Sequence, residues 1–358
     1  MLLERLVLNN YRNIEKIAMD DIDSGINIIY GNNAVGKTNL LESINYISSG
    51  KSFRNVSDLR LIKEGKKEAS ISANYSSKYS RGRIDIRIIG DEKKSIRINS
   101  MPIRKMSELM GVMNSVVFYP DDLKTIKDSP GLRRRMIDME LCKIDPSYYS
   151  DLQNYNKVIK NKNRVLKEQE IDRSLIDVYN EQLSKYGIQI IRKRRDFINE
   201  LNLHSQSFYR NFNEINEKLD IIYRSCIEDD DSQDGLREKI DESYDIELKN
   251  RTSVIGPHRE DLEILINGKD SKIFASQGQQ RTAMLAIKVS FLYIAEHMTG
   301  ERPILLLDDV FSELDEKRRK TLLDIIDGIQ VFITCTEIDD IETGKNATKI
   351  RIEDGRIV

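Results

Sequence analysis

A phosphate-binding loop is the clearest chemical feature of the sequence. The pattern G-x-x-x-x-G-K-[ST] is matched by Gly31, Asn32, Asn33, Ala34, Val35, Gly36, Lys37 and Thr38. The apolar run 26–30 precedes this loop and a helical stretch follows it, which is the setting that the pattern requires. Backbone N–H groups of such a loop, at a helix N-terminus, surround the phosphates of a nucleotide. We expect Lys37 to bridge the β- and γ-phosphates and the hydroxyl of Thr38 to bind Mg²⁺.

Two acidic residues follow a second apolar run. The run 304–307 contains only Ile and Leu, which is typical of a strand buried on both faces of a parallel sheet. Asp308 and Asp309 come next, where ligands bind in open α/β sheets. We expect Asp308 to hold the Mg²⁺ through water. Asp309 is a candidate to orient or deprotonate the attacking water, because γ-phosphoryl transfer depends on positioning and charge compensation.

A short polar segment before a long helical pattern offers a second anion site. It consists of Ser276, Gln277, Gly278 and Gln279. The first N–H groups of a helix have no partner within the helix, so they can bind an anion. An ordinary N-cap is the plainer interpretation of the same residues. Because the loop at 31–38 already holds one side of a nucleotide, a second phosphate site makes most sense if it serves the ATP of another subunit.

Length and composition limit the class of protein. The 358 residues allow two or three domains, at ~150 residues per domain. The chain has 57 Lys and Arg against 59 Asp and Glu, and the net charge of −2 argues against a globally basic coat protein of nucleic acid. The three Cys and three His are scattered, which argues against a disulfide framework or a zinc site. No stretch approaches the ~18 apolar residues of a membrane span, so we expect a cytoplasmic protein without a membrane partner.

Alternating and periodic patterns predict the elements that position these residues. Strands are expected over 2–9 and 26–30, and an antiparallel sheet with one solvated face over 69–99. Helices are expected over 151–169 and 174–211. Strand and helix then alternate, with strands at 262–266, 303–307 and 330–334 and helices at 277–298 and 316–326.

The order of these elements predicts an α/β domain that a helical domain divides in the sequence. The first part, with the phosphate loop and the antiparallel sheet, is expected in residues 1–130. The inserted helical arm is expected in 131–250 and the second part of the α/β domain in 251–358.

Charge is distributed unevenly along the chain. Residues 51–105 hold fifteen Lys and Arg against six Asp and Glu, a local excess of nine positive charges. Residues 227–247 hold ten acids and two bases. A run of charge is usually a solvated face. The basic stretch and the helix at 160–164 are nevertheless the best candidates for contacts with a nucleic-acid backbone.

The order of the motifs resembles the ABC-type P-loop ATPase heads of the SMC kind. The shared sequence is the phosphate loop, S-Q-G-Q at 276–279, the LLLDD strand and then S-E-L-D at 312–315. Within that superfamily the chain resembles the RecF family of bacterial recombinational repair proteins. The segments that carry this resemblance span nearly the whole chain: LNNYRNI at 8–14, FYPDDL at 118–123, PGLRRRMID at 130–138, KNRVL at 162–166 and GPHREDL at 256–262. The resemblance implies a head with a mixed central sheet and an antiparallel β subdomain, interrupted by an α-helical insertion.

The resemblance also implies an ATP-dependent DNA-binding protein. Residues 276–279 would be the signature motif that faces the partner's ATP, and 312–315 the D-loop at the dimer interface. Two heads would enclose ATP and Mg²⁺ and close as a homodimeric clamp on double-stranded or gapped DNA, and weak, DNA-stimulated hydrolysis would release it. Arg12 resembles a family position near the nucleotide phosphates. RecO and RecR are implied as partners, with the loading of RecA as the task.

The chain departs from the general ABC pattern at three places. Asp309 stands where most ABC ATPases have Glu, although Asp-Asp is typical of the RecF family. Residues 119–122 occupy the region where a Gln would sense the γ-phosphate. Cys335 and Thr336 stand where a switch histidine is expected, so we predict neither sensor.

Two other functions use the same loop. A transporter-type ABC ATPase subunit would bind a membrane partner through its helical insertion, but the basic helix around Arg133 and the missing switch histidine argue against it. A small-molecule phosphotransferase would leave the signature motif without a purpose.

Overall fold

The structure is a computed structural model, and it describes the whole chain except residues 91–93, 214–216, 228–230 and 338–346. It divides into two compact units, which are described separately. The first comprises Met1–Asp122, Phe208–Ile215 and Met284–Val358, and the second Leu123–Ser207 and Asn216–Ala283. The predicted boundaries of head and arm at 130/131 and 250/251 stay a prediction.

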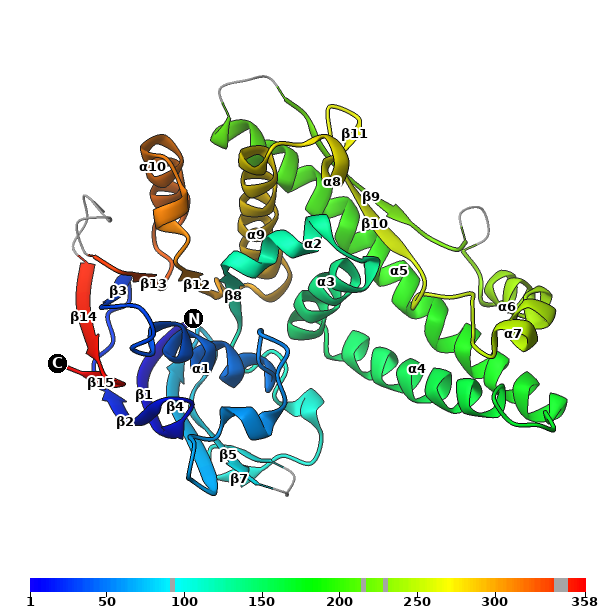
Figure 1. The fold of residues 1–358 in the computed structure, drawn as a ribbon, viewed down its shortest axis with the longest axis horizontal. Coiled ribbons are helices and arrows are strands. Elements are labelled where there is room, and N and C mark those ends of the chain that lie inside the picture. The colour runs from blue at the N-terminus through cyan, green and yellow to red at the C-terminus, as the bar shows by residue number, and fades with distance from the viewer. Residues whose placement is uncertain (91–93, 214–216, 228–230, 338–346) are drawn as a thin grey trace. The chain divides into compact units, whose positions relative to one another are not determined.

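A six-stranded sheet forms the centre of the first unit, in the order β15-β14-β3-β13-β12-β8 (Figure 1). Its strands are β3 (Ile26–Tyr30), β8 (Ser115–Phe118), β12 (Ile304–Asp308), β13 (Val331–Cys335), β14 (Ala347–Glu353) and β15 (Arg356–Ile357). Neighbouring strands are parallel, except that β15 pairs antiparallel with β14. β12 and β13 are buried along their whole length, because both faces of a central parallel strand are covered. The predicted mixed central sheet is confirmed.

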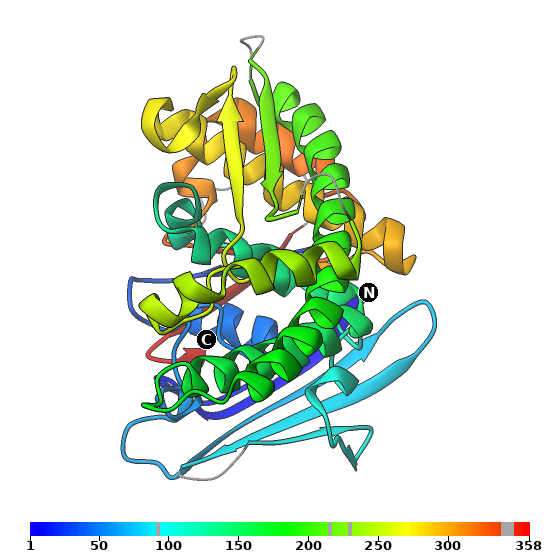
Figure 2. The same ribbon diagram turned by 90° about the vertical axis from the view of Figure 1, so that its right-hand side faces the viewer.

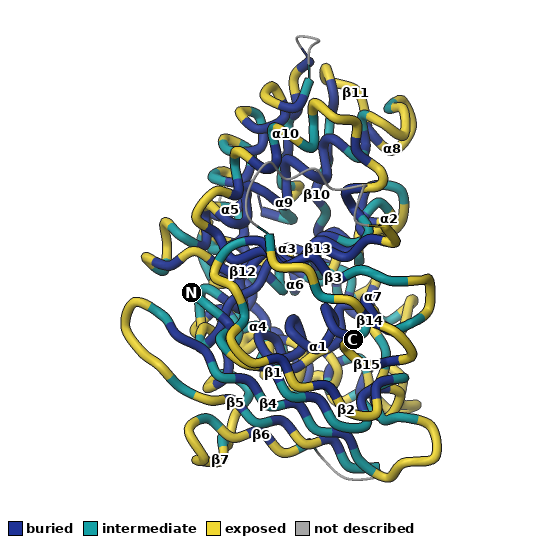
Figure 3. The backbone as a smooth tube through the Cα atoms, turned by 90° about the vertical axis from the view of Figure 1, so that its left-hand side faces the viewer, coloured by how far each residue is buried: buried dark blue, intermediate teal, exposed yellow. Residues whose placement is uncertain are grey.

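The second sheet of this unit is antiparallel, in the order β2-β1-β4-β5-β6-β7. Its strands are β1 (Leu2–Tyr11), β2 (Ile14–Met19), β4 (Glu68–Ser76), β5 (Arg81–Ile89), β6 (Ser95–Ile98) and β7 (Met101–Pro102). β4 and β5 pair along their whole length as a long hairpin (Figure 2). Burial alternates along both strands, because one face packs against the core and the other meets solvent (Figure 3). The predicted sheet with one solvated face is confirmed.

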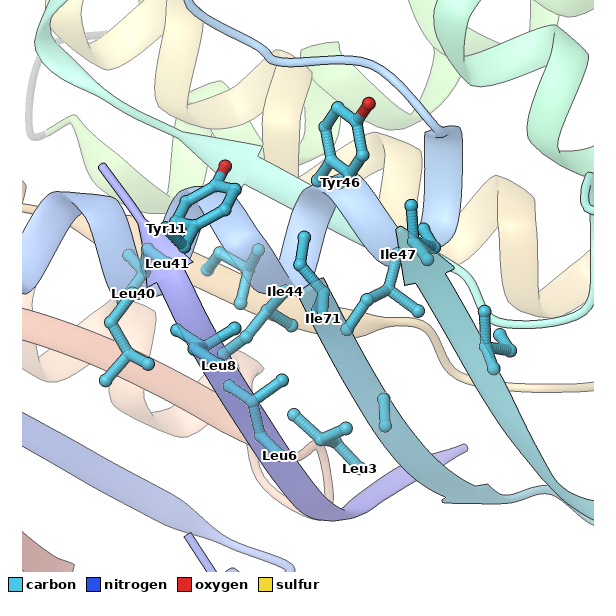
Figure 4. Close-up of a cluster of buried hydrophobic side chains, with 14 of the residues drawn as sticks. Leu3, Leu6, Leu8, Tyr11, Leu40, Leu41, Ile44, Tyr46, Ile47 and Ile71 are labelled. Carbon is cyan, nitrogen blue, oxygen red and sulfur yellow. The ribbon is translucent and has the colours of Figure 1, made fainter. Parts of the chain in front are cut away.

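Helix α1 (Lys37–Ser49) contacts both sheets, namely β8, β12 and β13 of one and β4 of the other. Its side chains Leu40 and Ile44 lie among Leu8 and Ile71 of the antiparallel sheet in one continuous apolar cluster (Figure 4). The helix ends at Gly50, whose left-handed backbone is the usual C-terminal cap and whose N–H donates to a carbonyl of the last turn. Because α1 is buried nearly throughout, the phosphate loop at its N-terminus is held in a fixed place.

The other helices of the first unit are α10 (Glu316–Ile325) and the later part of α9 (Gln277–Thr299). The unit also has the 3-10 turns η1 (Asp58–Leu61), η2 (Met106–Glu108), η3 (Pro120–Asp122) and η4 (Phe311–Glu313). The helices predicted at 277–298 and 316–326 are confirmed within a residue at each end. None of the helices among the described residues is long and apolar enough to cross a membrane.

The second unit is mostly helical. Its helices are α2 (Leu123–Lys127), α3 (Pro130–Ile144), α4 (Pro146–Val165), most of α5 (Arg173–Phe212), α6 (Gln233–Glu242), α7 (Tyr244–Asn250) and α8 (Ser271–Phe274). A small sheet has the order β11-β10-β9, with β9 (Leu219–Arg224), β10 (Asp261–Ile266) and β11 (Lys269–Asp270). The predicted helix over 151–169 starts earlier, because Asp145 caps the backbone N–H groups of Ser147 and Tyr148 and Pro146 occupies the first helical position.

Buried ion pairs join the helices of this unit. Arg194 of α5 forms a bidentate pair with Asp138 of α3, with N–O distances of 2.9 and 3.0 Å. Lys162 of α4 lies 2.6 Å from Glu247 of α7, and both side chains are fully buried. The hydroxyl of Ser253 donates to the other oxygen of Glu247 at 2.7 Å. Burial lowers the pKa of Lys162, although the Glu247 carboxylate acts in the opposite direction.

We expect Glu247→Gln to destabilise the protein strongly, because it leaves the Lys162 ammonium buried without an opposite charge. Removal of one partner of a buried ion pair costs about 3–5 kcal/mol, which urea unfolding can measure. The double variant Lys162→Met/Glu247→Leu should regain much of that loss, since apolar replacements of a buried pair are often neutral. The exposed Glu238→Gln on α6 is the control, and an equal loss in control and test variant would contradict the prediction.

Candidate nucleotide-binding site

The phosphate loop connects β3 to α1 and depends on two glycines. Gly31 has φ 147° and Gly36 has φ 117°, backbone conformations that other residues rarely adopt. A Cβ on Gly31 would clash with the carbonyl oxygen of Ile352 in β14, and one on Gly36 would lie 2.9 Å from Oδ1 of Asn13. The glycines therefore let the loop pack closely against β14 and the turn between β1 and β2.

The Lys37 side chain hydrogen-bonds to the backbone of the phosphate loop. Its Nζ donates to the carbonyl oxygens of Gly31 at 2.6 Å and Asn32 at 2.9 Å, and the residue is buried. The ammonium group is thus directed into the turn of the loop, where its hydrogen bonds help to fix the loop's shape.

Thr38 and Asp308, the two predicted Mg²⁺ ligands, are hydrogen-bonded to each other. The Thr38 hydroxyl donates to Oδ1 of Asp308 at 2.8 Å, and the hydroxyl of Thr334 donates to the same oxygen at 2.8 Å. The three residues come from the start of α1 and the ends of β12 and β13, where Asp308 and Thr334 are direct partners in the parallel register. Hydroxyl and carboxylate oxygens are the hard ligands that Mg²⁺ prefers, so Thr38 and Asp308 have suitable chemistry for the metal.

The environment of Asp308 disfavours its charged form. Burial raises the pKa of Asp308, and the neighbouring carboxylate of Asp309 adds to this. The hydrogen bonds from Thr334 and Thr38 and the positive charge of Arg54 act in the opposite direction. A buried carboxylate of this kind would be stabilised by a bound cation.

Asp309 has an unusual backbone conformation beside this cluster. Its φ is 53°, its N–H donates to the Thr334 hydroxyl at 2.9 Å, and its carbonyl accepts from Ser312 at 2.7 Å. These bonds hold the chain as it leaves β12 and enters residues 312–315, the predicted D-loop. At the end of that segment Asp315 caps α10 through the N–H of Arg318. The catalytic role of Asp309 stays a prediction.

Arg12 is engaged by an acid rather than by the phosphate loop. Its guanidinium forms two hydrogen bonds with the fully buried Glu42 of α1, at 2.9 and 2.8 Å, and a third with the carbonyl of Arg60. The Glu42 carboxylate, through its hydrogen bond and its charge, raises the pKa of Arg12 against the effect of burial. The expected place of Arg12 near nucleotide phosphates stays a prediction.

The next residue, Asn13, contacts the loop directly. Its amide donates to the carbonyl oxygens of Val35 at 3.0 Å and Ala34 at 3.4 Å, and its own oxygen accepts from Asn39 at 2.8 Å. Arg54 in turn donates to Asn39 at 3.0 Å. Sequence reasoning assigned no role to these side chains, nor to Thr334. Two sequence features could have indicated them. Asn13 belongs to the N-Y-R-N turn at 10–13, and Thr334 ends the predicted strand 330–334, at the same sheet edge as Asp308.

The segment 276–279 begins helix α9 and belongs to the second unit. Ser276 and Gln279 form a reciprocal capping box: the Gln279 N–H donates to the Ser276 hydroxyl at 3.2 Å, and the Ser276 N–H donates to the Gln279 side chain at 2.8 Å. Gln279 also donates to Glu217 at 2.6 Å. The plainer N-cap interpretation therefore describes this conformation, while Ser276, Gln277 and Gly278 remain exposed.

An ion pair occupies the region where a sensor glutamine would be expected. Asp122 lies 2.7 Å from Nζ of Lys288 in α9, and both side chains are buried. Lys288 also donates to the carbonyl of Val117 at 2.8 Å, and the Tyr119 N–H donates to Asp122 at 3.0 Å. Asp122 is thus bound to the part of α9 that belongs to the first unit.

The chain is similar to known proteins over nearly its whole length. The family model described as the RecF/RecN/SMC N terminal domain matches residues 2–358. The "DNA replication and repair protein RecF" of Clostridium acetobutylicum is 42% identical over 361 residues, covering 100% of this chain and 99% of that protein. The protein of the same name from Clostridium botulinum is 43% identical over 345 residues, covering 96% of this chain and 94% of that protein.

Solved structures of RecF proteins are also similar to this chain. The structure described as "the recombination mediator protein RecF-ATP in RecFOR pathway" has a TM-score of 0.93 at 36% identity, covering 99% of this chain and 96% of that chain. An Smc head bound to a domain of ScpA has a TM-score of 0.59 at 17% identity, covering 100% and 97%, and shows the fold alone. The fold is therefore an ABC-type P-loop ATPase head. The chain belongs to the RecF family.

Replacement of Asp308 by Asn tests the environment of that carboxylate. Because its pKa is raised on folding, the stability that Asp308 contributes is present below the unfolded pKa of ~3.9 and is lost as the pH rises through the folded value. Asp308→Asn, whose amide oxygen can accept the same hydrogen bonds, should therefore raise the unfolding free energy of the nucleotide-free protein at pH 7. The gain should shrink toward pH 4 in denaturant titrations. A gain that is the same at both pH values would contradict the assignment.

Proposed function

We propose that this protein is an ATP-dependent DNA-binding protein of replication and recombinational repair, in which ATP binding joins two copies into a clamp. The observation that carries the proposal is the contact of Thr38 with Asp308 beside a glycine-rich loop that ends in Lys37. The names of the relatives support the process, and the RecF-ATP structure at 36% identity supports the nucleotide.

Each residue of the site has a distinct proposed role. The backbone of residues 31–38 and the ammonium of Lys37 bind the phosphates, and Thr38 and Asp308 hold Mg²⁺, which supplies charge compensation for the transferred phosphoryl group. Asp309 orients or deprotonates the attacking water. Because the side chain of Asp309 is one methylene shorter than the glutamate of most ABC ATPases, we propose weak, DNA-stimulated hydrolysis that acts as a switch. Arg12 lies near the phosphates in this proposal, and Glu42 orients it.

The signature segment acts on the nucleotide of the partner subunit. Residues 276–279 place a helix N-terminus and an exposed serine hydroxyl at the surface, which is a suitable arrangement for an anion. The phosphate loop can cover only one side of ATP, so a second copy supplies the other side. The D-loop at 312–315 lies at the same interface in this proposal, and residues 131–250 form the arm of the clamp.

The proposed partners follow from the family. They are double-stranded and gapped DNA, RecR and RecO, with the loading of RecA as the result. A transporter-type ABC ATPase subunit is the alternative, and the dependence of DNA affinity on salt distinguishes the two. A clamp that touches six or more phosphates should show a log–log slope of about −5 or steeper, whereas a transporter subunit should show no salt-dependent DNA binding.

Sedimentation velocity with and without ATP and duplex DNA tests the proposal. The wild-type protein should sediment as a dimer only with ATP, and duplex DNA should co-sediment with that dimer. Lys37→Ala should remove both effects, because the loop loses the ammonium group that binds the phosphates. Its urea unfolding curve should stay cooperative, which separates lost binding from lost folding. Dimerisation of Lys37→Ala with ATP would refute the ATP-dependent clamp.

A further inference from the structure

The solvated face of the antiparallel sheet contains an arginine-lined hollow, which we call the arginine trough. It encloses about 790 Å³ over β1, β4, β5 and β6, all within the first unit. Four arginines line it, namely Arg5, Arg83, Arg87 and Arg97, and all four are exposed. Among the described residues, Asp85 is the one acid in its lining.

Strand register explains the shape of the trough. β4 lies between β1 and β5 and presents Ser70, Ser72 and Asn74 to this face, with Glu68 at its start beside Arg87. The arginines stand on β1 at one side and on β5 and β6 at the other. The cross-strand rows on this face are Arg5, Asn74 and Arg83; Val7, Ser72, Asp85 and Arg97; and Asn9, Ser70, Arg87 and Ser95. The result is a floor of hydroxyl and amide groups, with Arg5 at one side and the arginines of β5 and β6 at the other.

The arginines are available to an external anion. Arg83 pairs with Asp85 at 2.8 Å, Arg5 pairs with Asp20, and Arg87 pairs with Glu68. All three carboxylates are partly exposed. Exposed ion pairs of this kind contribute little, so the guanidinium groups can exchange carboxylate for phosphate. Arg97 has no acidic partner among the residues that the structure describes.

The donors of the trough match the phosphate backbone of a double helix. Guanidinium, serine hydroxyl and asparagine amide groups are the side chains that contact phosphate oxygens. From β1 to β6 the sheet spans three strand spacings, ~14 Å, which is close to the ~12 Å width of the DNA major groove. Arg5 at one side and Arg97 at the other are thus spaced to contact phosphates on both strands of the duplex. None of the lining residues that the structure describes is aromatic, and aromatic side chains are the stacking platform that single strands use.

We propose that the arginine trough binds the phosphate backbone of duplex DNA. This inference rests on the proposed DNA-binding function and adds the surface that performs it. The trough reads no base sequence, because its side chains end in backbone-binding groups. Its contribution should therefore be electrostatic and sensitive to salt.

The test compares two charge-matched double variants of the full chain. Arg83→Gln/Arg97→Gln removes two positive charges from the trough, and Lys320→Gln/Lys349→Gln removes two from exposed positions of the same unit outside its lining. Binding of a labelled 30-base-pair duplex with ATP is measured by fluorescence anisotropy over a range of salt concentrations. Sedimentation with ATP verifies that both variants still dimerise.

The trough variant should lose about tenfold in affinity at low salt, and its log–log slope should be shallower by about two, since each phosphate contact contributes ~0.9. The slope of the control variant should differ from the wild-type slope by less than about one. Equal affinities and slopes for test and control would overturn the inference, as would a trough variant that loses only single-stranded DNA or an acidic peptide. If the wild-type protein itself does not bind duplex DNA with ATP, the proposed function fails, which is a distinguishable result.

Discussion

The hydrogen bond from Thr38 to Asp308 joins residues that are 270 positions apart in the sequence. It depends on the order of three parallel strands, because β13 separates β3 from β12 and brings Thr334 against the same carboxylate. It also depends on α1, which both sheets hold in place by burial. The antiparallel sheet therefore contributes to the nucleotide site although none of its strands supplies a predicted ligand. The apolar core around α1 sets the position of the Thr38 hydroxyl, and the central parallel sheet sets the position of the Asp308 carboxylate.

Strong local patterns made much of this architecture predictable. The glycine-lysine loop is recognised by its motif, the strand at 304–307 by its unbroken apolar run, and the long helices by their helical spacing of apolar residues. The strand β14 was not predicted, because only Ile352 of its seven residues is buried. The short β8 and the strand β9 were missed as well, since few residues define them. In each case contacts elsewhere in the fold, rather than the local sequence, decide the structure.

Side-chain partners were harder to predict than elements. Glu42 occupies a helix position that any sequence pattern treats as ordinary, yet it is fully buried and holds Arg12. Asn13 contacts the phosphate loop because the turn between β1 and β2 lies against it, and only the fold reveals that proximity. The capping box of Ser276 and Gln279 could be expected from their spacing, whereas a role toward a second subunit depends on an assembly.

Net charge is a poor guide to partners in this chain. The near-neutral total combines an arginine-lined sheet face in one unit with acids in the other that partly serve the fold. Glu247 compensates the buried Lys162, and Asp241 pairs with Arg237 at 2.7 Å. Charges that satisfy internal partners and charges that face solvent must be counted separately.

In the proposed assembly, each nucleotide site combines the phosphate loop of one copy with residues 276–279 of another. A mixture of Lys37→Ala and Ser276→Arg tests it directly, because their heterodimer pairs one intact loop with one intact signature segment. Each variant alone should lack DNA-stimulated ATP hydrolysis, and the mixture should regain a measurable fraction of the wild-type rate. A mixture as inactive as its two components would contradict the account.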